Sequence, residues 1–281
     1  MKMDRFLLLA IGALALIIIF ALVFGAAFFC AICASIPGTV DNSVMTDKNY
    51  AWDGSLSGFQ NVRLEAQNVN GNVIIIEGEG EDYKIEVKAR GTEKDFEKWD
   101  VTFEESTASG AKKLDLNIVP GRGFETRAND KFVSQVMITL PKNKTYSMEV
   151  VTVNGNIEAG QFSGSKAVMS TVNGAIESKV EATQLEFVNV NGDIDAMTAQ
   201  ASGMVLATTV NGDITVSVPK NSSFKVEAHA VTPMDSLSSS IPLEYSEKSR
   251  FTMIGQTEGY SGNDLRMNLN VVNGDIRIKS L

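Results

Sequence analysis

Cysteine and histidine are scarce in this chain of 281 residues, which contains two Cys and one His. The single histidine, His229, excludes a metal site built from several imidazoles and leaves one candidate for a catalytic imidazole. Both cysteines, Cys30 and Cys33, lie in an apolar run near the N-terminus. The rest of the chain therefore has no thiolate for metal binding or catalysis and must be stable without disulfides.

Signatures of common catalytic and nucleotide-binding sites are also missing. The sequence has no Gly-x-Ser-x-Gly nucleophile motif and no phosphate-binding Gly-Lys loop. Positive charge is in deficit, because 25 Lys and Arg stand against 34 Asp and Glu. Binding of nucleic acid requires basic surface that replaces phosphate counterions, so this balance argues against it. We expect no enzymatic activity, no cofactor, no metal and no nucleic-acid partner.

Charged residues are absent from Phe6 to Ala34, a run of 29 residues. About 20 apolar residues suffice to cross the hydrocarbon core of a bilayer. Cleaved signal peptides have shorter apolar cores, so residues 6–34 predict an uncleaved transmembrane signal anchor. Cleavage after Ala34 is the alternative, because Ile32-Cys33-Ala34 loosely resembles a cleavage site. Lys2 and Arg5 place residues 1–5 in the cytoplasm by the positive-inside rule.

The part of the chain after this run is then extracytoplasmic at the cell membrane. From Asp41 onward it carries 23 basic and 33 acidic residues, so the negative charge belongs to the exported part. Residues 35–58 contain the turn signals Pro37-Gly38 and Asp53-Gly54 and predict a linker. Within them, Tyr50 and Trp52 either lie at the membrane interface or pack on the next domain.

An internal repeat is the most informative feature that the sequence does contain. The motif Val-Asn-Gly-x-(Ile/Val) occurs six times, with middle intervals of 19, 18 and 20 residues. A period of about 20 residues is typical of stacked units that are each too small to bury their own apolar face. The intervals of 84 and 62 residues must hold degenerate copies or inserted hairpins. The candidate structural corners are Asn70, Gly71, Asn154, Gly155, Asn173, Gly174, Asn191, Gly192, Asn211, Gly212, Asn273 and Gly274.

Side-chain phase distinguishes a meander of hairpins from a solenoid. Six and four residues before each Asn the side chain is apolar, as at Met148 and Val150, which is strand alternation with one buried face. The next position that is apolar in every copy is the Val directly before Asn, a step of three that indicates a turn. In a two-residue hairpin the residues flanking the loop would share a face, but here they mix Val with Asn or Asp. We therefore predict an all-β fold, a β-solenoid (β-helix) over residues 59–281 after one N-terminal transmembrane helix.

The residue types suit such corners. Asn tolerates the left-handed conformation, and Gly adopts a positive φ without steric cost. Stacking would align Asn173, Asn191 and Asn211 on successive coils, where side-chain amides can form a hydrogen-bonded ladder.

The long intervals contain further patterns. Strands are predicted at 83–90, 99–104, 113–119 and 133–140, and a helical turn at 92–96 with Thr92 as its cap. Pro141 and Pro219 read as strand stops. Residues 221–245 are rich in Ser and Pro and predict a long loop or an insertion.

Several polar groups have ordinary structural interpretations. His229 lies in an apparent strand, and Glu77 to Asp82 predict a solvated acidic turn, with weak Ca²⁺ binding as the alternative. Asp193, Asp213 and Asp275 supply one acid per repeat, fewer than calcium-binding β-rolls use. Asn143 and Asn221 begin glycosylation sequons.

The Val-Asn-Gly-Asp-Ile copies, the Ile-Thr-Leu-Pro-Lys segment at 138–142 and the Val-Asn-Gly-Asp-Ile-Arg-Ile segment at 272–278 resemble the putative-adhesin family of domains of unknown function. The resemblance covers about residues 60–281. It implies a β-helix attached to the cell envelope, a partner that is an envelope protein or a glycan, and no established catalytic residues. Some relatives lie beside envelope-stress regulators, so an accessory role in that signalling is the second expectation. Polysaccharide-cleaving β-helices cluster carboxylates on one face, and the repeat positions predict no such cluster here.

Overall fold

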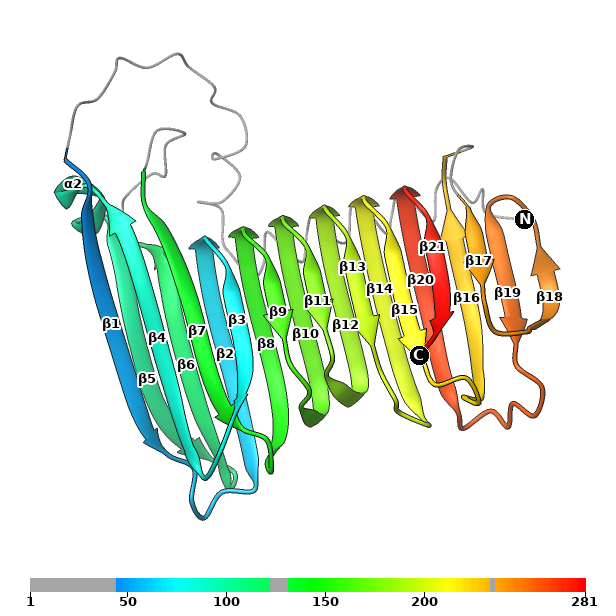
Figure 1. Ribbon diagram of the computed structural model, residues 1–281, viewed down its shortest axis with the longest axis horizontal. Coiled ribbons are helices and arrows are strands. Elements are labelled where there is room, and N and C mark those ends of the chain that lie inside the picture. Colours follow the sequence, from blue (N-terminus) through cyan, green and yellow to red (C-terminus); the bar gives the residue numbers. More distant parts are fainter. Residues whose placement is uncertain (1–43, 122–130, 233–235) are drawn as a thin grey trace.

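The computed structural model describes residues 44–121, 131–232 and 236–281, which form two sheets stacked face to face along one axis (Figure 1). Sheet A has ten strands and sheet B has eleven, so the predicted all-β class is confirmed. The only helix in the described ranges is the four-residue α2 (Glu93–Phe96). Among these residues no helix combines the length and apolar character needed to cross a bilayer. The expected anchor at 6–34 and the cytoplasmic segment at 1–5 lie outside them.

The strands follow one another in space in an order that differs from the sequence. Sheet A consists, in spatial order, of β1 (Thr46–Ser55), β4 (Asp82–Gly91), β7 (Val133–Pro141), β3 (Val73–Gly78), β9 (Ile157–Ala159), β11 (Ile176–Ser178), β13 (Ile194–Met197), β15 (Ile214–Val218), β21 (Ile276–Ser280) and β17 (Leu237–Ser239). Sheet B consists of β5 (Trp99–Ala108), β6 (Ala111–Pro120), β2 (Asn61–Asn70), β8 (Thr145–Asn154), β10 (Ser163–Asn173), β12 (Glu181–Asn191), β14 (Gly203–Asn211), β20 (Leu265–Asn273), β16 (Phe224–Ala230), β19 (Thr252–Gln256) and β18 (Glu244–Lys248).

Each copy of the motif forms one strand–corner–strand coil, as the phase of the sequence predicted. A strand of sheet B ends at the motif Asn, and a strand of sheet A begins three residues later. The six resulting motif coils are β2–β3, β8–β9, β10–β11, β12–β13, β14–β15 and β20–β21. Successive coils pair in parallel and in register, so that Asn173 lies opposite Asn154 on one side and Asn191 on the other.

Alternating apolar side chains fill the space between the sheets. The positions six and four residues before Asn are buried, as at Leu185 and Phe187, both 1% exposed. The third inward position is two residues before Asn, as at Thr209, which is 0% exposed. The predicted third core position, the Val directly before Asn, is buried in three coils, at Val69, Val153 and Val172, and only partly buried in the other three, as at Val210. Strand alternation continues up to the corner because the Thr hydroxyl finds a hydrogen-bond partner there.

The two long intervals are excursions that build the ends of the stack. The first forms β4, α2 and β5–β7, which together with β1 make the N-terminal cap; β5 and β6 are an antiparallel hairpin. The second forms β16–β19, the C-terminal cap, where β18 and β19 pair antiparallel. After each excursion the chain returns, and the six motif coils are contiguous in space (Figure 1).

The linker predicted for residues 35–58 is wrong over its second half. Residues 46–55 form β1, which pairs antiparallel with β4 along all ten residues. Gly54 is not a turn residue: a Cβ there would lie 2.7 Å from the hydroxyl of Tyr83, so the ring needs the space. Trp52 packs 5.5 Å from Phe103, between ring centroids, and Tyr50 stacks on Trp52. Of the two positions expected for Tyr50 and Trp52, packing on the domain is the one observed.

Of the two predictions for residues 221–245, the long loop is wrong, whereas an insertion is what the structure shows. It contains β16 and β17 and reaches the start of β18. The pattern from Phe224 to Ala230 alternates buried and more exposed residues, and seven residues are enough for a strand once a parallel neighbour is present. The four predicted strands, the strand ends at Pro141 and before Pro219, and the cap at Thr92 are confirmed.

Candidate functional site: the stacked corners and the outer faces

The corner asparagines form one continuous ladder across all six motif coils. The Nδ2 of each Asn donates to the Oδ1 of the Asn in the preceding coil at 2.7 to 2.8 Å. The ladder predicted for three residues therefore extends over both long intervals, from Asn70 to Asn273. Its amides bond one another, so the corners act structurally, as the residue types indicated.

The corner glycines are required mainly because successive corners approach closely. A Cβ on Gly192 would lie 2.1 Å from the carbonyl oxygen of Gly174 in the preceding coil, and its φ is +140°. Gly155 lacks such a positive φ, yet a Cβ there would lie 2.1 Å from the Gly71 oxygen. Positive φ, the reason given by sequence, is thus only part of the requirement.

A second ladder lies just inside the corner and was missed by sequence reasoning. The buried side chain two residues before the motif Asn donates to the glycine carbonyl of the preceding coil. These bonds are Thr152 to Gly71 (3.1 Å), Thr171 to Gly155 (2.9 Å), Asn189 to Gly174 (2.7 Å) and Thr209 to Gly192 (3.2 Å). The recurrence of Thr or Asn at this position was visible in the sequence, but it suggested an exposed surface. Buried polar groups need such partners, and here the backbone supplies them.

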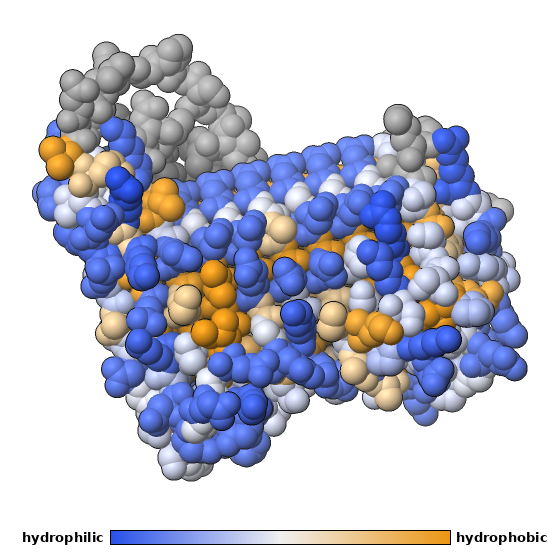
Figure 2. Space-filling view, viewed as in Figure 1, coloured by the Kyte–Doolittle hydropathy of each residue, from blue (hydrophilic) through white to orange (hydrophobic). Residues whose placement is uncertain are grey.

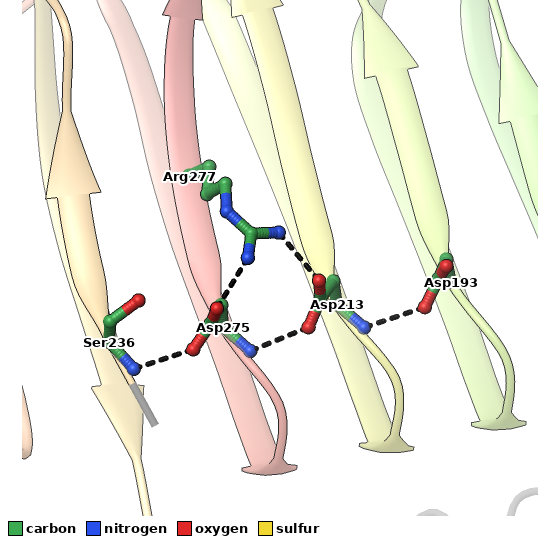
Figure 3. Close-up of polar contacts among 5 residues, drawn as sticks. All are labelled: Asp193, Asp213, Ser236, Asp275 and Arg277. Carbon is green, nitrogen blue, oxygen red and sulfur yellow. Dashed lines mark hydrogen bonds and ion pairs between the residues drawn. The ribbon is translucent and has the colours of Figure 1, made fainter. Parts of the chain in front are cut away.

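A third ladder follows the glycine, on the outside of the coil. Asp213 accepts a hydrogen bond from the Asp275 N–H at 2.8 Å and bonds Arg277 at 2.5 Å, and Asp193 accepts from the Asp213 N–H (Figure 3). Arg277 also contacts Asp275. Partial burial raises the pKa of Asp213, but the Asp275 N–H and Arg277 outweigh burial, so the pKa lies below its usual value. Asp193, Asp213 and Asp275, which the sequence presents as separate acids, are therefore stacked, and Asp213 and Asp275 share the Arg277 guanidinium.

The outer face of sheet A carries an aligned row of carboxylates. Glu177 lies opposite Glu158 on one side and Asp195 on the other, and all three are exposed. The expectation that no carboxylates cluster by repeat position is therefore wrong. Neighbouring parallel strands lie about 4.8 Å apart, so these like charges face one another at close range and favour a cationic neighbour.

The outer face of sheet B is charged at the N-terminal end, but its charges are paired. Lys113 lies 2.7 Å from both Glu65 and Asp115, and Arg63 lies 2.6 Å from Glu65. The hydrogen bond that Lys113 donates to Asp115, followed by the one that it donates to Glu65, raises the pKa of Lys113. Figure 2 shows hydrophilic residues over most of one side of the stack, with small hydrophobic patches between them.

The remaining polar candidates are occupied by local contacts. His229 lies in β16 with Nε2 3.2 Å from Glu227, as an ordinary strand residue. Glu81 of the acidic turn accepts from Asn143 at 2.6 Å and pairs with Lys144; the Lys144 bond, then the Asn143 bond, lowers its pKa. In the described ranges no three His, Cys, Asp or Glu side chains are arranged to hold a metal ion.

Comparisons with known proteins agree with this architecture. No curated protein matches the chain. A solved structure of a putative cell adhesion protein from Clostridium sporogenes is 14% identical with a TM-score of 0.55, over 84% of this chain and 100% of that one. A putative adhesin from Bacteroides fragilis is 11% identical with a TM-score of 0.32, over 82% of this chain and 97% of that one. The family described as Toastrack DUF4097 matches residues 149–279, which span the five motif coils from β8–β9 to β20–β21.

Proposed function

We propose that this protein is a membrane-anchored, extracytoplasmic scaffold whose β-solenoid binds another molecule of the cell envelope without catalysing a reaction. The observation that carries the proposal is the row formed by Glu158, Glu177 and Asp195 on sheet A. The Asn ladder and the inner Thr or Asn ladder run through these coils and hold the row in register, so the carboxylates are presented on a stiff support. A stiff array of like charges binds an oppositely charged partner without first having to be ordered.

The anchor in this proposal rests on the uncharged run from Phe6 to Ala34 and on the basic residues before it. β1 begins at Thr46, so 11 residues separate the run from the stack. Eleven residues reach at most about 40 Å, which would keep the N-terminal cap near the membrane. The motif coils would then lie beyond the cap, and the acidic row would be accessible to envelope components.

The partner that fits the row is a cationic segment of an envelope protein. A glycan, the other partner class expected from the family resemblance, fits less well because most sugars lack positive charge. The putative cell adhesion protein with the same fold supports an envelope role. An accessory role in envelope-stress signalling is the alternative; altered stress-induced transcription after gene deletion, with unchanged attachment, would favour it.

The experiment compares binding of the full-length protein in detergent micelles to arrays of basic peptides, acidic peptides and glycans. We expect salt-sensitive binding to basic peptides, and loss of that binding when Glu158, Glu177 and Asp195 are replaced by Gln, Gln and Asn. The matched control replaces Glu149 and Glu186, on the outer face of sheet B, by Gln and should bind normally. Absence of binding to every array, with unchanged cell attachment after gene deletion, would refute the proposal.

A further inference from the structure

The β20–β21 coil lies inside the stack although it follows the C-terminal cap in sequence. β20 pairs in parallel with β14 on one side and β16 on the other, and β21 lies likewise between β15 and β17. Figure 1 shows this coil in red between the yellow β14–β15 coil and the orange cap strands. β16–β19 thus precede the β20–β21 coil in the sequence, although in space this coil lies between them and the β14–β15 coil.

We propose that this position is a strand-exchange slot, and that it also takes the β20–β21 coil of a second copy of this chain. In such an exchange the donated coil forms the same contacts between molecules that it otherwise forms within one. The inference is independent of the acidic row and of any envelope partner. The slot is then a self-assembly surface, and the segment that it binds is the β20–β21 coil of another copy of the chain.

The slot is built to hold an apolar strand–corner–strand segment. The inward side chains of the coil are at most 2% exposed, namely Leu265, Met267, Leu269, Val271, Ile276 and Ile278. An empty slot would leave this much apolar surface uncovered, together with the free edges of four parallel strands. Because unpaired strand edges recruit another strand, the vacated position favours occupation by a second coil.

The connection that precedes the coil can serve as the hinge. Residues 257–264 join β19 to β20, and eight extended residues reach roughly 27 Å. Gly259 and Gly262 have φ of +80° and +85°, and a Cβ at either would meet nothing within 4 Å. The connection is bonded to the core at its ends, where Thr257 bonds Phe224 and Asp264 bonds Ser223, and its middle is bonded only locally, as by the Ser261 N–H to Asp264. It can therefore extend without disturbing the core.

Arg277 makes this coil, rather than another copy of the repeat, the matching occupant. Its guanidinium lies between Asp213 of the slot and Asp275 of its own coil (Figure 3). The residues at the same place in the other motif coils are Ile74, Glu158, Glu177, Asp195 and Thr215. None of these is basic, and the acidic ones would place a further carboxylate beside Asp213.

Cross-linking of full-length chains in detergent micelles tests the exchange. Thr208 and Asn270 face each other across the β14–β20 pair, and both lie on the outer face of sheet B. With Cys30 and Cys33 replaced by Ala, one chain carries Thr208→Cys and the other Asn270→Cys. Parallel neighbours about 4.8 Å apart satisfy disulfide geometry. We expect a disulfide-linked dimer after the two chains are refolded together and oxidised.

The control uses the other neighbour of the same residue. Val188 faces Thr208 across the β12–β14 pair, where the two motif coils follow one another directly in the sequence. Chains with Val188→Cys and Thr208→Cys should give little dimer, whereas Thr208→Cys and Asn270→Cys in one chain should give an internal disulfide. Equal dimer in the control mixture, no dimer in the test mixture, or no internal disulfide would each overturn the proposal.

A third comparison isolates the recognition by Arg277. Adding Arg277→Glu to the Asn270→Cys chain should lower the dimer yield several-fold, because the donated coil then brings a carboxylate to Asp213. Adding Arg277→Lys should retain most of the yield. An unchanged yield with Arg277→Glu would overturn the assigned role of Arg277.

Discussion

In the N-terminal cap, aromatic rings fill the space between the sheets, whereas the motif coils fill it mainly with aliphatic side chains. Trp99 stacks on Phe132 with centroids 4.4 Å apart, and Phe96 meets the same ring edge-on at 5.6 Å. In the motif coils the contacts that repeat are those of the corner: the Asn ladder, the Thr or Asn ladder and the glycine approach. The cap is thus specified by individual large side chains, and the coils by backbone clearance and small polar groups.

The difference predicts which substitutions each region tolerates. A motif coil should accept changes of aliphatic size but no added atom at a corner glycine. The cap should accept added atoms at its open turns but not the loss of a ring. The predictions below test this contrast by placing one kind of change in each region.

The largest effect is expected from Gly192→Ala in a motif coil. The methyl group would lie 2.1 Å from the Gly174 oxygen, at a φ of +140°. Positive φ and overpacking each cost about 1–3 kcal/mol, so we expect a loss of about 4 kcal/mol in the free energy of unfolding. Denaturant-induced unfolding followed by circular dichroism measures the loss.

The matched control is Gly110→Ala in the β5–β6 turn of the cap. Gly110 has a φ of +77°, but a Cβ there would meet nothing within 4 Å. Only the conformational cost remains, about 1 kcal/mol. Equal losses for the two variants would show that close approach of the corners does not matter.

The next effect is the loss of a ring from the cap. Trp99 is 5% exposed, so Trp99→Ala opens a cavity against Phe132 and should cost about 3 kcal/mol. Phe187→Leu in β12 keeps the core of the coil largely filled and should cost about 1 kcal/mol. If Phe187→Leu proved the more damaging change, the motif coils would depend on large side chains as the cap does.

A smaller effect is expected from the inner ladder. Thr171→Val keeps the side-chain shape but removes the hydroxyl that bonds the Gly155 carbonyl at 2.9 Å, and should cost about 1–2 kcal/mol. Val271 occupies the same place in β20 without a hydroxyl. Val271→Thr should therefore lower the free energy of unfolding by much less than burial of a hydroxyl without a hydrogen-bond partner does. Thermal unfolding of both variants decides whether the ladder contributes.

Sequence reasoning succeeded where one residue type recurs at a fixed place. Six copies of Val-Asn-Gly predict the corners, their Asn ladder and the strand–corner–strand coils. Repeats of one sequence form coils of one shape, and such coils bury their apolar faces by stacking on one another. It failed where a polar residue is buried by a partner on another coil, as at Thr171, since hydropathy assigns a hydroxyl to the surface. It also failed for β1, where Gly54 signals a turn locally but makes room for Tyr83 from a distant strand.

The order of the coils in space could not be predicted from the sequence for a related reason. Nothing in the 62-residue interval before Asn273 shows that β20–β21 returns to a place between β14–β15 and β16–β17. The aligned acids Glu158 and Glu177 are both the fourth residue after a motif Asn, so the repeat itself predicts their register. Their register is a consequence of the repeat, whereas the insertion of the last coil is a consequence of tertiary pairing.

The smallest effect concerns the outer ladder and its dependence on pH. The pKa of Asp213 is lowered in the folded protein, so its ionised form contributes stability above the unfolded value near 3.8. This contribution is lost as pH falls through the lower folded value. Asp213→Asn should therefore leave a shallower decline in the unfolding midpoint below about pH 4. The effect is modest because the side chain is 38% exposed and water screens the pair.

Asp195→Asn is the matched control, since Asp195 lies one coil away on the exposed row of sheet A. Its carboxylate faces Glu177 across the β11–β13 pair, so its replacement should stabilise the fold slightly near neutral pH. The two carboxylates would then differ in the sign of their effect: Asp213 is the Asp of Asn211-Gly212-Asp213, whereas Asp195 lies two residues after the same motif in the preceding coil. Identical pH profiles for the two variants would mean that Arg277 does not distinguish the β20–β21 coil from its neighbours.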